Sequence, residues 1–211
     1  MKITSLPVGK SQTYCYIVYN EETNQGLIVD PGDQASRIIE VLKEQHIQPV
    51  AILVTHGDTD QVMASDQVQR TFGIPLFIHD DDKDLLDIIP SVSSFASGDY
   101  DRLSVPSNVK SIDEGEYQFA GFDIKVMHTS GHTKGSVSYY FKDFNVVFSG
   151  DVVQNSDKQS RAGLSLSSMI KFISSIKRIL DLPPETMIYA SHSDPVTVED
   201  ARIKWGSLLK Y

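Results

Sequence analysis

The sequence predicts an α/β fold made of layered strands and helices, and three observations support this. Short runs rich in β-branched and aromatic residues alternate with segments whose apolar residues recur at helical spacing. The run Val50–Val54 is apolar throughout, which is typical of a strand buried on both faces of a sheet. No internal repeat and no shift in composition divides the 211 residues, so we expect residues 1–211 to form a single domain.

In the first half of the chain, strands and helices follow one another closely. Strands are expected where β-branched and aromatic residues cluster between polar turns, and helices where apolar residues recur every three or four positions. Gly73 is placed to end the second helix, because glycine readily adopts the left-handed conformation that follows a helix. In order, the expected elements are strands at Thr13–Tyr19 and Gly26–Asp30, a helix at Asp33–His46, the strand Val50–Val54, a helix to about Phe72 and a strand at Pro75–His79.

The second half begins with a segment of a different kind. Residues Pro90–Asn108 are rich in serine and have no clear period, so we expect a loop or hairpin that covers a site. Further on, Thr197 and Asp200 resemble a capping box, which predicts the start of a final helix. The other expected elements are strands at Phe122–Met127, Val137–Phe141 and Val146–Phe148, a helix at Ser167–Leu180 and a strand at Met187–Ala190.

The composition excludes several classes of function. A formal net charge of −9 argues against a nucleic-acid-binding protein and against docking on an anionic membrane. No run of about 18 apolar residues is present, and the N-terminus lacks the apolar core of a signal peptide. The single cysteine, Cys15, lies in a predicted strand and is expected to be a small buried residue. We therefore expect a cytoplasmic protein that acts on a small molecule, whereas its oligomeric state stays open.

Side chains that can bind a metal occur where predicted strands end. His56, Asp58 and Asp60 follow the strand Val50–Val54, and three later strands are followed by His132, Asp151 and His192. Strand ends on one edge of a sheet can converge on one point. Imidazole nitrogens and carboxylate oxygens are ligands of zinc, iron and manganese. This arrangement predicts a metal site at the edge of a sheet.

Several motifs, in this order and spacing, resemble the metallo-β-lactamase superfamily over nearly the whole chain. They are Gln12–Val18, Ile28–Gly32, Thr55-His56, Thr129–Ser136 (TSGHTKGS), Phe148–Asp151 and Ser191–Ser193. The resemblance implies an αβ/βα sandwich of two mixed β-sheets flanked by helices, with metals bound at the sheet edges.

The family's metal motif, His-x-His-x-Asp-His, is altered at two positions here. Asp58 occupies the place of the second histidine and Gln61 the place of the last one. By resemblance, one metal would have His56, Asp58, His132 and Asp151 as ligands, and the other Asp60, Asp151, His192 and the weak amide of Gln61. We expect one or two divalent ions, with zinc favoured and with iron or manganese as alternatives, because carboxylates favour harder ions. The second ion is expected to bind less tightly or to be absent.

The resemblance implies a metal-dependent hydrolase of the small, glyoxalase-II-like kind. It would act on an ester, thioester, lactone or similar bond through metal-activated water, with Asp60 or Asp151 orienting that water. True glyoxalase II activity is disfavoured, because those enzymes add a helical C-terminal domain that binds glutathione. Two alternatives stay open: a degenerate protein with weak metal binding and little catalysis, and a redox protein with an iron site.

Other polar residues have both a functional and a structural interpretation. Lys158 and Arg161 are candidates to bind an anionic substrate group, although scattered surface cations are equally common. Together with Tyr100 and Arg102 they fall in Pro90–Asn108 and Gln154–Gly163, two segments expected to flank the metal site. His46 is expected to be exposed, His79 to be a surface or hydrogen-bonded histidine, and His128 and Asp30 to have structural roles. The acidic run Asp80–Asp84 could attract a cation, but a solvated helix start is expected instead.

Overall fold

The computed structural model describes residues 1–95, 103–153 and 165–206 and contains two six-stranded sheets. The first has the strand order β1-β2-β3-β4-β5-β6, with antiparallel pairing from β1 to β3 and parallel pairing from β3 to β6. Its strands are Lys2–Val8, Thr13–Tyr19, Gln25–Val29, Gln48–Leu53, Leu76–Ile78 and Val109–Ser111. This sheet is therefore mixed.

The second sheet has the order β12-β11-β10-β9-β8-β7. Only β10 and β11 pair in parallel; its other neighbours are antiparallel, so this sheet is mixed as well. Its strands β7 to β12 are Gly115–Phe119, Phe122–His128, Val137–Phe141, Val146–Gly150, Met187–Ala190 and Val196–Thr197.

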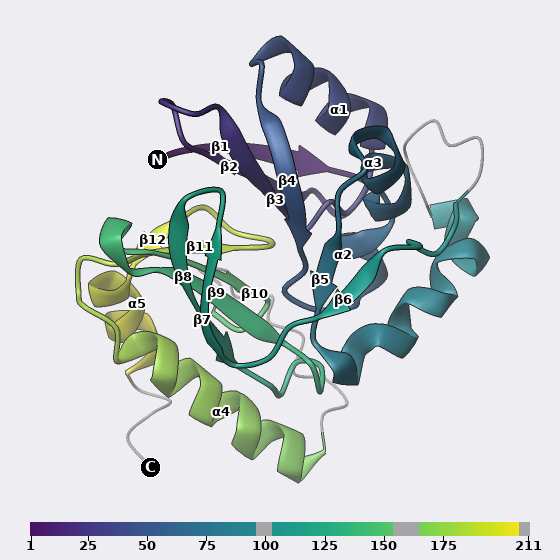
Figure 1. The fold of residues 1–211 in the computed structure, drawn as a ribbon. Coiled ribbons are helices and arrows are strands. Elements are labelled where there is room, and N and C mark those ends of the chain that lie inside the picture. Colours follow the sequence, from purple (N-terminus) through teal and green to yellow (C-terminus); the bar gives the residue numbers. More distant parts are fainter. Residues whose placement is uncertain (96–102, 154–164, 207–211) are drawn as a thin grey trace.

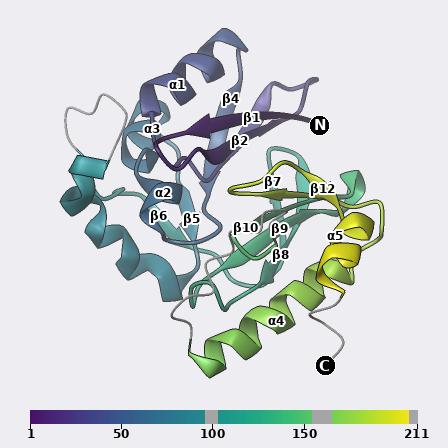
Figure 2. The same cartoon turned by 180° about the vertical axis from the view of Figure 1, so that it is seen from behind.

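Helices cover the outer face of each sheet (Figures 1 and 2). On the first sheet lie α1 (Ala35–Glu44), α2 (Thr59–Val62), α3 (Ser65–Phe72) and the 3-10 segment η1 (Asp80–Phe95). On the second lie α4 (Leu166–Leu180) and α5 (Val198–Trp205), and the short 3-10 turn η2 (Lys142–Phe144) joins β9 to β10.

Three apolar clusters hold these layers together. One lies between the first sheet and its helices and includes Ile38 and Val68. The second lies between the two sheets and includes Tyr16, Leu53 and Phe148. The third lies between the second sheet and α4 and α5. The αβ/βα sandwich of two mixed sheets is thus confirmed. Within Val50–Val54, Val50 is partly buried and the other four residues are buried, because helices cover one face of the sheet and the second sheet covers the other.

The predicted elements agree with the structure except in a few places. The strands Thr13–Tyr19, Val137–Phe141 and Met187–Ala190 have the predicted bounds, and Thr197 caps α5 by accepting a hydrogen bond from Asp200 N. The prediction of one helix that continues to Phe72 is wrong. The segment divides into α2 and α3, because Ala64 N donates to the carbonyl oxygen of Pro31. Among the described residues, no helix is long and apolar enough to cross a membrane.

Candidate active site

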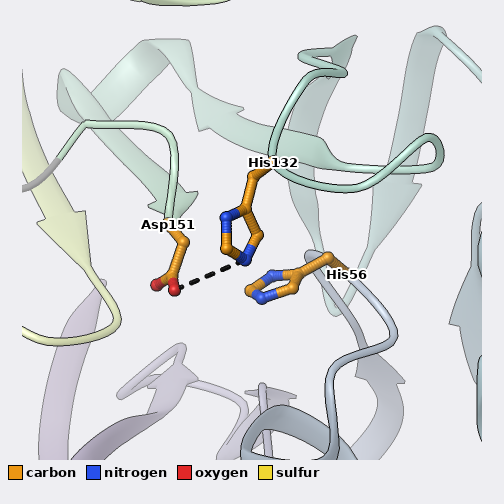
Figure 3. Close-up of side chains that lie close together, drawn as sticks. All are labelled: His56, His132 and Asp151. Carbon is orange, nitrogen blue, oxygen red and sulfur yellow. Dashed lines mark ion pairs between the residues drawn. The ribbon is translucent and has the colours of Figure 1, made fainter. Parts of the chain in front are cut away.

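Six histidine and aspartate side chains gather where strands of both sheets end. His56 and Asp58 follow β4, and Asp60 lies in the first turn of α2. His132 follows β8, Asp151 follows β10 and His192 follows β11. Figure 3 shows His56, His132 and Asp151 pointing toward one another, and a possible ligand atom from each lies within 4.8 Å of the others. The convergence expected from the sequence is therefore present.

The distances divide the cluster into two groups that share Asp151. In the first group, Asp58 Oδ2 lies 3.0 Å from His132 Nε2 and 3.6 Å from His56 Nε2. In the second group, Asp60 Oδ2 lies 3.2 Å from His192 Nε2. Asp151 Oδ2 lies 3.6 Å from Nε2 of both His132 and His192, so this carboxylate stands between the groups.

The hydrogen bonds around His56 fit a tautomer that leaves Nε2 free to bind a metal. The Thr55 hydroxyl donates to Asp30 Oδ2 at 2.8 Å and lies 3.0 Å from His56 Nδ1. A hydroxyl has one proton, so if Thr55 donates it to Asp30, His56 Nδ1 carries the other proton and donates to Thr55. His56 Nε2 is then left with a free lone pair. Asp30 has the structural position that the sequence predicted.

Two buried atoms of the cluster have no hydrogen-bond partner among the described residues. They are His56 Nε2 and Asp151 Oδ1. A buried polar atom without a partner costs about 1–3 kcal/mol, so such atoms point to a missing ligand. Both are metal-ligating atoms and both belong to the cluster, so the donor set fits a divalent metal ion.

The cluster perturbs the acidity of its own members. Burial opposes ionisation of Asp58 and Asp60, but hydrogen bonds with His132 and His192 and the nearby imidazoles outweigh it and lower both pKa values. Burial also opposes charging of His132 and His192, yet the neighbouring carboxylates outweigh it and raise their pKa values. Burial dominates at His56 and lowers its pKa. The carboxylates of Asp58 and Asp60 and the imidazoles of His132 and His192 therefore stabilise one another's charged forms.

Gln61 is fully buried in α2, and neither atom of its amide has a hydrogen-bond partner among the described residues. The helix packs tightly here, because a Cβ on Gly32 would collide with the backbone carbonyl group of Asp60. Among the described residues, no hydrogen bond joins this amide to the six His and Asp side chains. Its place as a metal ligand stays a prediction.

Two positioning residues could not be identified from the sequence. The Thr13 hydroxyl, at the start of β2, donates to Asp60 Oδ2 at 3.0 Å. Asp82 was expected to be solvated with the rest of Asp80–Asp84, and this is wrong, because it is 1% exposed. Its carboxylate accepts hydrogen bonds from Gly57 N, Gly135 N and the Thr133 hydroxyl. Asp82 thus joins the loop that contains His56 to the loop that contains His132.

The remaining histidines lie outside the cluster. The rings of His79 and His128 stack with centroids 4.2 Å apart, and with Asp81 they form a second group that could hold a metal. However, Asp81 N donates to His79 Nδ1, and His128 Nε2 lies 2.9 Å from the Lys134 carbonyl oxygen. One nitrogen of each ring is therefore already hydrogen-bonded, as expected for structural histidines. His46 is exposed and Cys15 is fully buried, as predicted.

A cleft of about 690 Å³ begins at the cluster, where Asp58 and His132 line it. The two segments expected to flank the site can be placed only in part. Lys158 and Arg161, with the whole of Gln154–Gly163, lie outside the described residues, as do Tyr100 and Arg102. The described end of Pro90–Asn108 hydrogen-bonds to α3, where Gln69 Oε1 accepts from the backbone N–H groups of Ser107 and Asn108.

Two curated relatives match almost the full length of the chain. The probable metallo-hydrolase YqgX of Bacillus subtilis is 32% identical over 205 residues, which are 95% of each protein. The hydroxyacylglutathione hydrolase GloC of Haemophilus influenzae is 29% identical over 94% of this chain and 93% of its own. Hydroxyacylglutathione hydrolase is the systematic name of glyoxalase II. The expectation that every glyoxalase II carries an additional C-terminal domain therefore does not hold for GloC.

Solved structures agree with the fold and with the family. The B3 metallo-beta-lactamase BLEG-1 superposes with a TM-score of 0.85 at 32% identity over the full length of both chains. The di-iron-bound form of TTHA1623 has a TM-score of 0.78 at 26% identity, over 95% of this chain and 97% of its own. The family model described as the metallo-beta-lactamase superfamily matches residues 8–192. This chain belongs to the metallo-beta-lactamase superfamily.

Proposed function

We propose that this protein is a metal-dependent hydrolase of acyl compounds, with thioesters as the leading substrate class. The observation that carries the proposal is the convergence of three histidines and three aspartates around two unpartnered buried ligand atoms, His56 Nε2 and Asp151 Oδ1. The names of YqgX and GloC support a hydrolase, and GloC supports a thioester substrate.

The ligands would divide as the distances do. His56, Asp58 and His132 would hold one ion and Asp60 and His192 another, with Asp151 between them. A bound divalent cation supplies an acidified water and polarises a carbonyl oxygen. Zinc, iron and manganese all accept a mixed set of imidazole and carboxylate ligands. Because the amide of Gln61 is a weak donor, we expect the Asp60 group to hold its ion less tightly.

The chain's own residues would orient the water and accept its proton. Thr13 and His192 contact the Asp60 carboxylate, and Nε2 of both His132 and His192 lies 3.6 Å from Asp151 Oδ2. In hydrolysis of a thioester, the water oxygen bonds to the acyl carbon and the carbon–sulfur bond breaks. The sulfur leaves with the electron pair and takes up a proton that Asp60 or Asp151 has accepted from the water.

The test is hydrolysis by the metal-stripped protein after reloading with zinc, manganese or ferrous iron. The compounds to be tested as substrates are a hydroxyacylglutathione, an aryl ester, a lactone and a β-lactam. The β-lactam is included because of the similarity to BLEG-1. We expect thioester hydrolysis that a chelator abolishes and that Asp151→Asn reduces by at least about a hundredfold. Asp181→Asn, an exposed position at the end of α4, is the matched control. A protein that binds metal but hydrolyses none of the four would contradict the proposal and favour a degenerate scaffold.

A further inference from the structure

Two lysines line the cleft beyond the His/Asp cluster. Asp58 and His132 line this cleft of about 690 Å³, and Lys134 and Lys171 line it as well. Lys134 lies two residues after His132 in the same loop, and Lys171 lies in α4. A substrate whose reacting carbonyl lies at the cluster would therefore extend toward ammonium groups.

The wall that contains both lysines is held together by close contacts. Gly131 has a φ of +132°, and a Cβ there would collide with the backbone of Phe172, the residue after Lys171. On the same helix, the Ser175 hydroxyl donates to the Ser130 carbonyl oxygen at 2.7 Å. One turn further, Arg178 Nη1 donates to the carbonyl oxygen of His128. The loop is fixed on α4, so the two lysines belong to one surface.

The charges around this surface leave the lysines available for an anion. Both are exposed, and within the described parts of the chain neither forms an ion pair. Of the aspartates that line the cleft, Asp58 belongs to the cluster and Asp82 accepts three hydrogen bonds from the protein. Asp81 faces the imidazoles of His79 and His128, with a carboxylate oxygen within 4.8 Å of a nitrogen of each.

We propose that Lys134 and Lys171 bind a carboxylate of the substrate and thereby select acyl thioesters whose thiol part is anionic. The hydroxyls of Ser165, Ser167 and Ser168, which line the same cleft, add neutral hydrogen-bond donors. Hydrogen bonds between an ammonium group and a carboxylate are roughly twice as strong as neutral ones. This inference rests on the proposed hydrolase function, because it assumes that the reacting bond lies at the cluster.

A matched pair of substrates tests the anion contact. These are the propionyl thioesters of N-acetylcysteine and of N-acetylcysteine amide, which differ only in the carboxylate. We expect the metal-loaded protein to prefer the anionic thioester in kcat/KM, and Lys134→Gln/Lys171→Gln to reduce that preference about tenfold. Lys177→Gln removes an exposed charge from α4 away from the cleft and should leave the preference unchanged.

A binding experiment separates this inference from the proposed function. S-propyl-N-acetylcysteine and its amide cannot be hydrolysed, so their dissociation constants, measured by calorimetry, do not depend on catalysis. The carboxylate should bind about tenfold more tightly than the amide to the unmodified protein and equally to the double variant. If none of the four substrates named above and neither propionyl thioester is hydrolysed but this difference is found, the anion site stands and the hydrolase proposal fails. Equal binding of both thioethers to the unmodified protein, or no binding of either, would overturn the anion site.

Discussion

Substitution of Asp82 by alanine should destabilise the protein by loosening two loops of the site at once. The Asp82 carboxylate accepts from Gly57 N at 3.0 Å and from Gly135 N at 2.8 Å, and both glycines are buried. The Thr133 hydroxyl can hydrogen-bond to Ser136 Oγ instead, 2.7 Å away, so the loss of its bond to Asp82 adds little to the cost. Two buried N–H groups without partners cost about 2–6 kcal/mol together, because each costs about 1–3 kcal/mol. For a chain of this size, that corresponds to a fall in Tm of roughly 4–24 °C.

Urea unfolding of the metal-free protein measures this cost directly. Asp82→Asn, which keeps one acceptor oxygen, should lie between the unmodified protein and Asp82→Ala. Asp84→Ala is the matched control, because Asp84 lies in the same 3-10 segment and is exposed. We expect the control to change the free energy of unfolding by less than about 0.5 kcal/mol. If Asp82→Ala is no more destabilising than Asp84→Ala, the assigned role of this carboxylate is wrong.

Three further predictions concern the metal. His56→Ala and His132→Ala should each lower metal affinity by orders of magnitude, because each removes an imidazole from the group that contains Asp58. Equilibrium dialysis measures the affinity, and His46→Ala, at an exposed position, is the control. Gln61→His should raise zinc stoichiometry in the same assay, whereas Gln67→His should not; an unchanged value would mean that position 61 does not face the metal. Stripping the metal with a chelator should lower the Tm, since an ion that binds only the folded state stabilises it; an equal Tm for stripped and reloaded protein would argue against a site in the folded state.

Much of the fold and of the cluster is predictable because local chemistry and tertiary position coincide there. The strands Thr13–Tyr19 and Val137–Phe141 are rich in β-branched and aromatic residues and are buried in the sheets, so pattern and structure agree. Asp151 directly follows β10 and His132 lies in the loop after β8, and strand ends meet at one edge of the sandwich. The position of a strand end therefore carries information about the site.

Features that depend on distant contacts could not be predicted in this way. Asp82 resembles its solvated neighbours in the acidic run, and only the approach of Gly57 and Gly135 buries it. The break between α2 and α3 arises because the Pro31 carbonyl accepts from Ala64 N, a contact that helical periodicity does not encode. The edge strand Lys2–Val8 has an interrupted pattern, with Pro7 near its end, and was not predicted. Propensity is local, whereas these features are set by packing.

The metal content of the purified protein tests the central claim most directly. Elemental analysis of the chain, expressed without added chelator and compared with His56→Ala prepared in parallel, gives both the identity and the stoichiometry of any bound ion. We predict at least one equivalent of zinc, iron or manganese per chain, with the bound metal largely lost in the variant. A folded protein that contains no transition metal, or the same amount as His56→Ala, would contradict the assignment of this cluster as a metal centre.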